Sequence, residues 1–141
     1  MKTMNKKDFA EAVIRSGNAG RAFKPMATYI PEGDCIEAVI TPDDYHARRL
    51  DGLVTVYYSR RTGQIAGAMI KGVLAFCRKM AEKHPGFKIE LEGGAVKLEY
   101  IFLLRLWSEP RTLADVAVVR TYRDLIQAVE EESLEADLQL A

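Results

Sequence analysis

The sequence predicts a single α+β domain over residues 1–141, in which about three helices pack on one face of an antiparallel sheet of about six strands. The length of 141 residues suits one hydrophobic core. Apolar residues make up 48% of the chain and charged residues 28%, which is typical of a globular protein and excludes a disordered one. Short β-branched segments fill the middle of the chain, and apolar stripes at helical spacing flank them.

The N-terminal segment predicts a helix over Lys6–Ser16, because Phe9 and Val13 lie one turn apart on one face. Two prolines then interrupt regular structure. We therefore expect a loop or an edge strand over Met26–Ile30.

The segment from Asp34 to Lys71 predicts a meander of about four short strands. With Asp51 and Gly52 as a two-residue turn, Ala47 would face Val56 and Tyr45 would face Tyr58. The next turn contains a glycine and leaves two registers open for the returning strand.

A helix is expected over Gly72–Lys83, where Val73, Cys77 and Met80 share one face. The Pro85-Gly86 pair that follows disfavours further helix.

A β-hairpin is expected over Phe87–Trp107, with its turn at Gly93 and Gly94. In this register Leu91 faces Val96. The opposite face would carry two ion pairs, Glu90 with Lys97 and Lys88 with Glu99.

The second half of that hairpin, within Ala95–Trp107, is apolar on both faces. We therefore expect Ile101, Leu103 and Trp107 to be covered by another surface. The cover is either the same surface of a second copy, which we favour, or the first predicted helix.

A last helix is expected after an N-cap at Thr112, with Asp115 in its first turn and a buried stripe that reaches Val129. The acidic tail over residues 130–141 is expected to fray or to be disordered.

Charge argues against nucleic acid as a partner, because 20 basic residues balance 20 acidic ones. The balance is uneven along the chain: residues 1–83 hold 14 Lys/Arg against 9 Asp/Glu, and residues 84–141 hold 6 against 11. Segments of opposite net charge could face one another in a homodimer. No apolar run is long enough for a membrane helix, and two cysteines without a disulfide framework favour the cytoplasm.

Catalytic motifs are missing from the sequence, which has no phosphate-binding glycine loop, no nucleophile elbow and no zinc-ligand spacing. We therefore expect no metal and no cofactor. A concentration of polar residues in the predicted meander forms the candidate ligand site, and its members are His46, Arg48, Tyr57, Arg60, Arg61 and Lys71. In the predicted register His46, Arg48 and Tyr57 share one face, where rings and arginines could bind phosphate or a nucleotide.

Short motifs in the same region resemble those of a known group of proteins. Asp34-Cys35 opens a strand, Asp51-Gly52-Leu53-Val54 follows, and Thr62-Gly63-Gln64-Ile65-Ala66-Gly67 closes the meander. The chain thereby resembles a group of small bacterial domains of unknown function. The resemblance implies a bacterial cytoplasmic protein and carries over no catalytic residue.

The sequence favours a small, non-enzymatic binding or assembly module that forms a homodimer. The alternative is a small-ligand or nucleotide-binding protein, or an enzyme, that uses the polar face around His46, Arg48, Tyr57 and Lys71.

Overall fold

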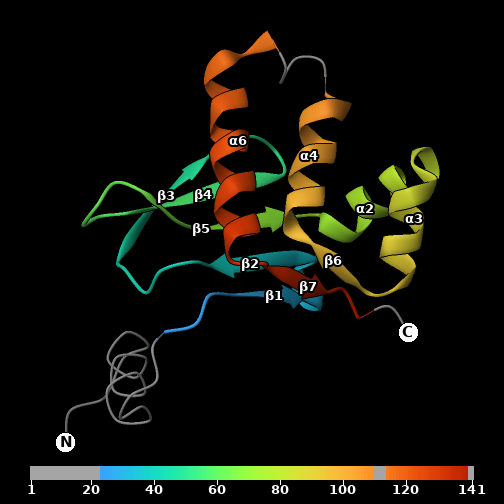
Figure 1. Ribbon diagram of the computed structural model, residues 1–141, viewed down its shortest axis with the longest axis horizontal. Helices are drawn as coiled ribbons and strands as arrows, with labels where there is room; N and C mark the ends of the chain where they lie inside the picture. The colour runs from blue at the N-terminus through green and yellow to red at the C-terminus, as the bar shows by residue number, and fades with distance from the viewer. Residues whose placement is uncertain (1–22, 110–113, 140–141) are drawn as a thin grey trace, which may run out of the picture.

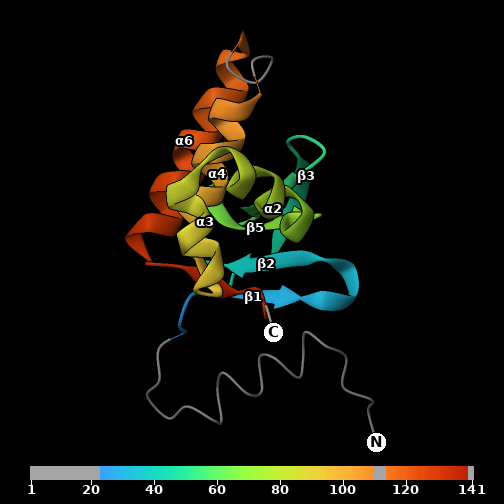
Figure 2. The same cartoon turned by 90° about the vertical axis from the view of Figure 1, so that its right-hand side faces the viewer.

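The computed structural model describes residues 23–109 and 114–139. The helix predicted over Lys6–Ser16 lies outside these ranges. In the described residues, one five-stranded and one two-stranded antiparallel sheet are present, and the helices lie on one side of the larger sheet (Figures 1 and 2). The predicted α+β class with an antiparallel sheet is confirmed, although the numbers of helices and strands differ.

The elements have the following bounds, in chain order: β1 (Met26–Ile30), the 3-10 turn η1 (Pro31–Gly33), β2 (Cys35–Val39), β3 (Tyr45–Arg49), β4 (Val54–Ser59), β5 (Ile65–Lys71), α2 (Val73–Lys83), α3 (Pro85–Glu92), β6 (Ala95–Lys97), α4 (Leu98–Ser108), α6 (Val116–Glu131) and β7 (Glu135–Asp137).

The larger sheet has the strand order β1-β2-β5-β4-β3. The predicted meander is right for β3, β4 and β5, but β2 pairs with β5 instead of β3. The N–H groups of Ile40 and Thr41 both donate to the Ala66 carbonyl, at 2.8 and 3.1 Å, so the chain runs beside β5 as far as Thr41. The segment Met26–Ile30, expected as a loop or an edge strand, forms the edge strand β1.

The register between β3 and β4 differs by one residue from the prediction, because Ala47 faces Tyr57 and Arg48 faces Val56. Asp51 explains the shift. Its Oδ1 accepts hydrogen bonds from the backbone N–H groups of Leu53 and Val54, both at 2.8 Å, so the turn is longer than two residues. The shift places His46 and Arg48 on the helix side of the sheet, beside Tyr58 and Val56, and leaves Tyr57 on the opposite side.

The core lies between the sheet and the helices. Along the middle strands, alternate residues on the helix side are almost completely buried: Ile36, Ala38, Val54, Val56, Ala68 and Ile70. Helix α2 adds Val73, Cys77 and Met80 to this core, as the predicted stripe requires. Asp34 fixes the start of α2, because its Oδ1 accepts hydrogen bonds from Leu74 N–H at 2.9 Å and from the Tyr29 hydroxyl at 2.8 Å.

The hairpin predicted over Phe87–Trp107 is wrong. Residues Pro85–Glu92 form α3, with the proline in its first turn. Phe87 and Leu91 are buried one turn apart, and Ile89 is 73% exposed. Leu91 and Val96 are therefore not cross-strand neighbours, and the ion pairs of Glu90 with Lys97 and of Lys88 with Glu99 do not form.

Strand β6 is short and pairs with β7, so that Val96 faces Ala136 and Lys97 faces Glu135. After it, residues Leu98–Ser108 form α4, where a strand was predicted. The structure also differs from the expected frayed tail, because β7 lies in residues 130–139 and Leu134, Ala136 and Leu138 are buried.

The last predicted helix is present as α6, with a later start. Its N-cap is Asp115, whose Oδ1 accepts hydrogen bonds from Ala117 N–H at 3.0 Å and Val118 N–H at 3.3 Å. The predicted N-cap, Thr112, lies outside the described residues. Tyr122, Leu125 and Val129 form the buried stripe of α6.

Candidate interaction surface

The candidate polar residues of the sheet do not gather at one place. His46 and Arg48 lie on the helix side, and the His46 ring stacks on Tyr58 with 5.7 Å between ring centroids. Tyr57 lies on the opposite side and stacks on Tyr45 at 4.2 Å. Tyr57 is also 5% exposed, and burial raises the pKa of its hydroxyl.

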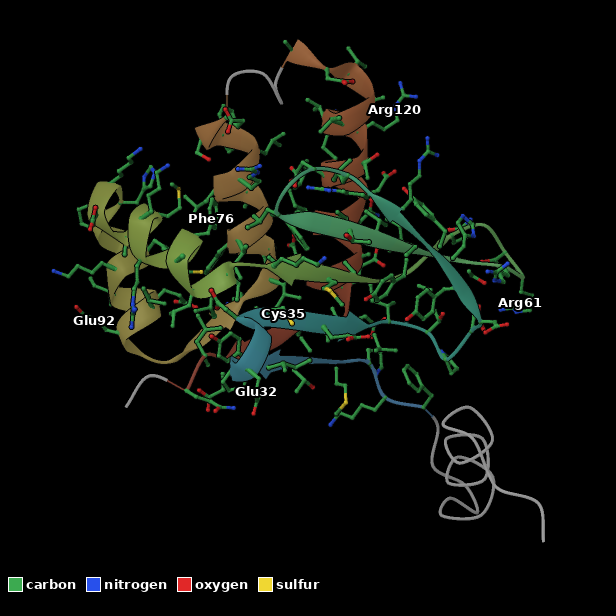
Figure 3. All side chains as sticks on the ribbon, turned by 180° about the vertical axis from the view of Figure 1, so that it is seen from behind. Glu32, Cys35, Arg61, Phe76, Glu92 and Arg120 are labelled. Atoms are coloured by element: carbon green, nitrogen blue, oxygen red, sulfur yellow. The ribbon has the colours of Figure 1, made fainter. Side chains whose placement is uncertain are left out.

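The other three candidates lie at the two ends of the sheet. Arg60 and Arg61 occupy the β4–β5 turn, where Arg60 Nε donates to the Tyr45 carbonyl at 3.2 Å and Arg61 Nη2 pairs with Asp43 at 3.3 Å. Lys71 ends β5 opposite Cys35. Figure 3 labels Cys35 and Arg61 at opposite ends of the sheet, so the six candidates form no common site.

The candidate interface residues lie on α4 instead of a strand. Ile101 is fully buried, which removes it from any interface. Leu103 is 36% exposed and Trp107 is 70% exposed, one turn apart on the outer side of the helix. The sequence predicted that Ile101, Leu103 and Trp107 would be covered by another surface. In the described residues Ile101 is covered within the chain, and Leu103 and Trp107 are left exposed.

These two side chains line a groove between α4 and α6, which stand side by side in Figure 1. We call it the α4–α6 groove. Its apolar lining consists of Leu103, Leu106, Trp107, Val119 and Ile126. Such a surface is of the kind that binds another apolar surface.

The polar lining of the groove comes from one side of α6 and changes sign along the helix. Arg123 lies at the middle of α6, Gln127 follows one turn later, and Glu130 and Glu131 lie at the C-terminal end. Gln127 Nε2 donates a hydrogen bond to Glu131 Oε1 at 3.1 Å. The groove therefore has a cationic end and an anionic end.

A polar network holds both groove helices against the sheet. Asp51 Oδ2, in the turn after β3, accepts hydrogen bonds from Arg105 Nε of α4 at 3.3 Å and from the Tyr122 hydroxyl of α6. Arg105 also lies 3.7 Å from a Glu109 carboxylate oxygen. One carboxylate thus fixes the positions of α4 and α6 relative to the sheet, and with them the shape of the groove.

The environment of this network shifts the pKa values of its members. Burial raises the pKa of Asp51, but hydrogen bonds from Tyr122, Val54 and Leu53 and the charge of Arg105 lower it more, so the net pKa is below the usual value. Burial and the hydrogen bond to Asp51 raise the pKa of Tyr122. Asp51 is therefore ionised and Tyr122 neutral over the physiological range.

This network could not be predicted from the sequence directly, because positions 51, 105 and 122 are far apart in the chain. The sequence nonetheless contains a signal of buried polar groups. Arg105 interrupts an apolar segment, Tyr122 carries a hydroxyl in an apolar stripe, and buried polar groups need hydrogen-bond partners.

The described residues offer little for chemistry of other kinds. Cys77 is fully buried, and burial raises the pKa of its thiol to about 12, which leaves it an unreactive core residue. Within residues 23–109 and 114–139, no three His, Cys, Asp or Glu residues lie together in a way that could hold a metal ion. In the same ranges no helix has the length and apolar character needed to cross a membrane.

No protein-family model, curated protein or solved structure matches this chain.

Proposed function

We propose that this protein is a non-enzymatic assembly module that forms a two-fold symmetric homodimer through the α4–α6 groove. The observation that carries the proposal is the exposed apolar lining of the groove, with Trp107 70% exposed at its edge. Tryptophan is the residue type most enriched among the strong contributors to protein interfaces.

Charge favours a second copy as the occupant of the groove. A two-fold axis near Gln127 would align the two α6 helices antiparallel. Arg123 of each copy would then lie close to the partner subunit's Glu130, because these residues flank Gln127 on the same side of the helix. The surface is therefore complementary to itself in charge as well as in apolar character.

The proposed setting is the bacterial cytoplasm. Cys35 and Cys77 are both free thiols, which suits a reducing compartment. The bacterial origin rests on the resemblance of the strand and turn motifs.

The first test is the substitution Leu103→Glu. We expect it to weaken dimerisation about a hundred-fold or more, because a carboxylate would be buried against the apolar lining of the second copy. Leu103 is partly exposed in one copy, so the fold should tolerate glutamate. Sedimentation velocity across a concentration series measures the dissociation constant.

Ile89→Glu is the matched control, since Ile89 is an exposed apolar residue on α3 that does not line the groove. It should leave the dissociation constant of the dimer unchanged. A wild-type protein that is monomeric at high micromolar concentration would contradict the proposed dimer.

The second test exchanges the charges at the two ends of the groove. Arg123→Glu and Glu130→Arg should each weaken the dimer about ten-fold, because each brings like charges together across the axis. The double variant should recover most of the wild-type affinity. If the double variant is weaker than either single variant, the antiparallel alignment of the α6 helices is wrong.

A further inference from the structure

The edge strand β3 is the open edge of the larger sheet. It is last in the strand order, and all five of its residues, Tyr45–Arg49, are exposed. The opposite edge strand, β1, has β7 beside it (Figure 1). An exposed edge presents unpaired backbone groups that can pair with another chain.

The hydrogen-bond pattern identifies which backbone groups of β3 point outward. Leu50 N–H donates to the Val54 carbonyl at 2.9 Å, and Arg60 N–H donates to the Asp44 carbonyl at 2.8 Å. Backbone groups alternate along an antiparallel pair, so the even-numbered residues of this segment face β4. The N–H and C=O groups of Tyr45, Ala47 and Arg49 therefore point away from β4, and of these the Tyr45 carbonyl already accepts a hydrogen bond from Arg60 Nε at 3.2 Å.

Two of the side chains along this edge, Arg48 and Arg49, are cationic, and neither forms an ion pair with a carboxylate in the described residues. Within the described residues, the side chain of Arg48 makes no hydrogen bond or ion pair. Arg49 Nε donates to the Asp51 backbone carbonyl at 3.2 Å, while the Asp51 carboxylate is occupied by Arg105 and Tyr122. Figure 3 also shows Arg120 projecting from α6 on the side where β3 runs.

A cleft runs beside β3 on the helix side. The sheet contributes Arg48 and Tyr58, and the N-terminal half of α6 contributes Ala117, Val118 and Thr121. Arg49, the next residue of β3, has its side chain on the opposite side of the sheet. A strand added to β3 would point every second side chain toward this cleft and the others toward the Arg49 side. Carboxylates on such a strand would meet an arginine on either side of the sheet.

We propose that the β3 edge binds an extended acidic segment of a partner protein, which adds to the sheet as a further strand. Main-chain hydrogen bonds to the Tyr45 N–H group and to both backbone groups of Ala47 and Arg49 would hold the segment. Arg48 and Arg49 would select acidic side chains. A second copy is a poorer occupant, because pairing β3 with itself about Ala47 would place Arg48 beside the partner's His46 and Arg49 beside the partner's Tyr45, so neither arginine would meet a carboxylate.

The test measures fluorescence anisotropy with a labelled peptide of about eight residues that alternates valine and glutamate. We expect saturable binding at about 50 mM salt that weakens as salt rises, because the arginines are exposed. A peptide with lysine in place of glutamate should not bind. A glutamate peptide with N-methylated backbone amides keeps its charge but loses its donors, and it should not bind either.

The variants test the same edge from the protein side. Ala47→Pro removes an outward N–H group that β4 does not use, and it should abolish binding. Arg48→Glu combined with Arg49→Glu should weaken the glutamate peptide at least about ten-fold and create binding of the lysine peptide. The matched control, Lys79→Glu with Lys83→Glu on α2, should change neither affinity.

Three results would overturn the proposal. Equal binding of the N-methylated peptide would mean a purely ionic contact. Equal binding of a single-stranded RNA would assign the edge to nucleic acid. If Ala47→Pro abolishes self-association instead of peptide binding, the edge belongs to a second copy. Leu103→Glu should leave peptide binding intact, which separates this proposal from that of the α4–α6 groove.

Discussion

Asp51→Ala is expected to lower the free energy of unfolding by about 3 kcal/mol, because it removes one partner from a partly buried ion pair and hydrogen-bond network. The Asp51 carboxylate accepts bonds from two backbone N–H groups, from Arg105 and from Tyr122. Without it, the Tyr122 hydroxyl loses its acceptor, and the Arg105 guanidinium keeps only the Glu109 carboxylate, at 3.7 Å. Urea unfolding followed by circular dichroism measures the loss.

Asp124→Ala provides the control, since Asp124 is an exposed carboxylate on α6, the helix that carries Tyr122. Its effect should stay within about 0.5 kcal/mol. Tyr122→Phe should be destabilising alone and nearly silent in the Asp51→Ala background, because the two residues share one hydrogen bond. Fully additive effects would mean that Asp51 and Tyr122 act independently.

The pKa of Asp51 adds a dependence on pH. Its pKa is lower in the folded chain than in the unfolded chain, where it is about 3.9. The ionised carboxylate therefore stabilises the fold above about pH 4, and this contribution is lost as the pH falls through the folded-state pKa. The stability difference between wild type and Asp51→Ala should be constant at neutral pH and shrink in acid.

The sequence correctly predicted the elements whose residue pattern fits only one type of secondary structure. Helix α2 has a single apolar stripe and breakers at both ends, and the β-branched segments of β4 and β5 have no competing helical pattern. The order of the strands in the sheet could not be predicted from the sequence, because it depends on how apolar surfaces of distant segments pack against one another. The β3–β4 register was missed because one Asp51 side chain lengthens the turn.

The wrong prediction of a β-hairpin over residues 87–107 has a physical cause. Phe87 and Leu91 satisfy both a strand of period two and one turn of a helix, and short apolar segments cannot separate the two. Pro85 was the deciding signal, since proline favours the first turn of a helix. Leu103 and Trp107 were named with Ile101 as interface candidates because the predicted strand was apolar on both faces. In α4 Leu103 and Trp107 are exposed and Ile101 is buried.

Gly67 is the position where the smallest substitution should have a large effect. Gly67 lies in β5 between Val39 of β2 and Tyr57 of β4. A Cβ atom there would lie 2.3 Å from the Ala38 carbonyl oxygen and 3.3 Å from the Tyr57 ring. Gly67→Ala should therefore force β2 and β5 apart and lower the free energy of unfolding by about 3 kcal/mol, as measured by urea unfolding.

Gly86→Ala is the control for the same chemical change at an open position. No atom lies within 4 Å of a Cβ built at Gly86, which is in the first turn of α3. Alanine has the higher helix propensity, so this variant should be neutral or more stable by up to about 1 kcal/mol. The clash at Gly67 involves a backbone oxygen in the middle of the sheet, where no side-chain rotation can relieve it. A Gly67→Ala variant as stable as Gly86→Ala would mean that β2 and β5 are farther apart than described.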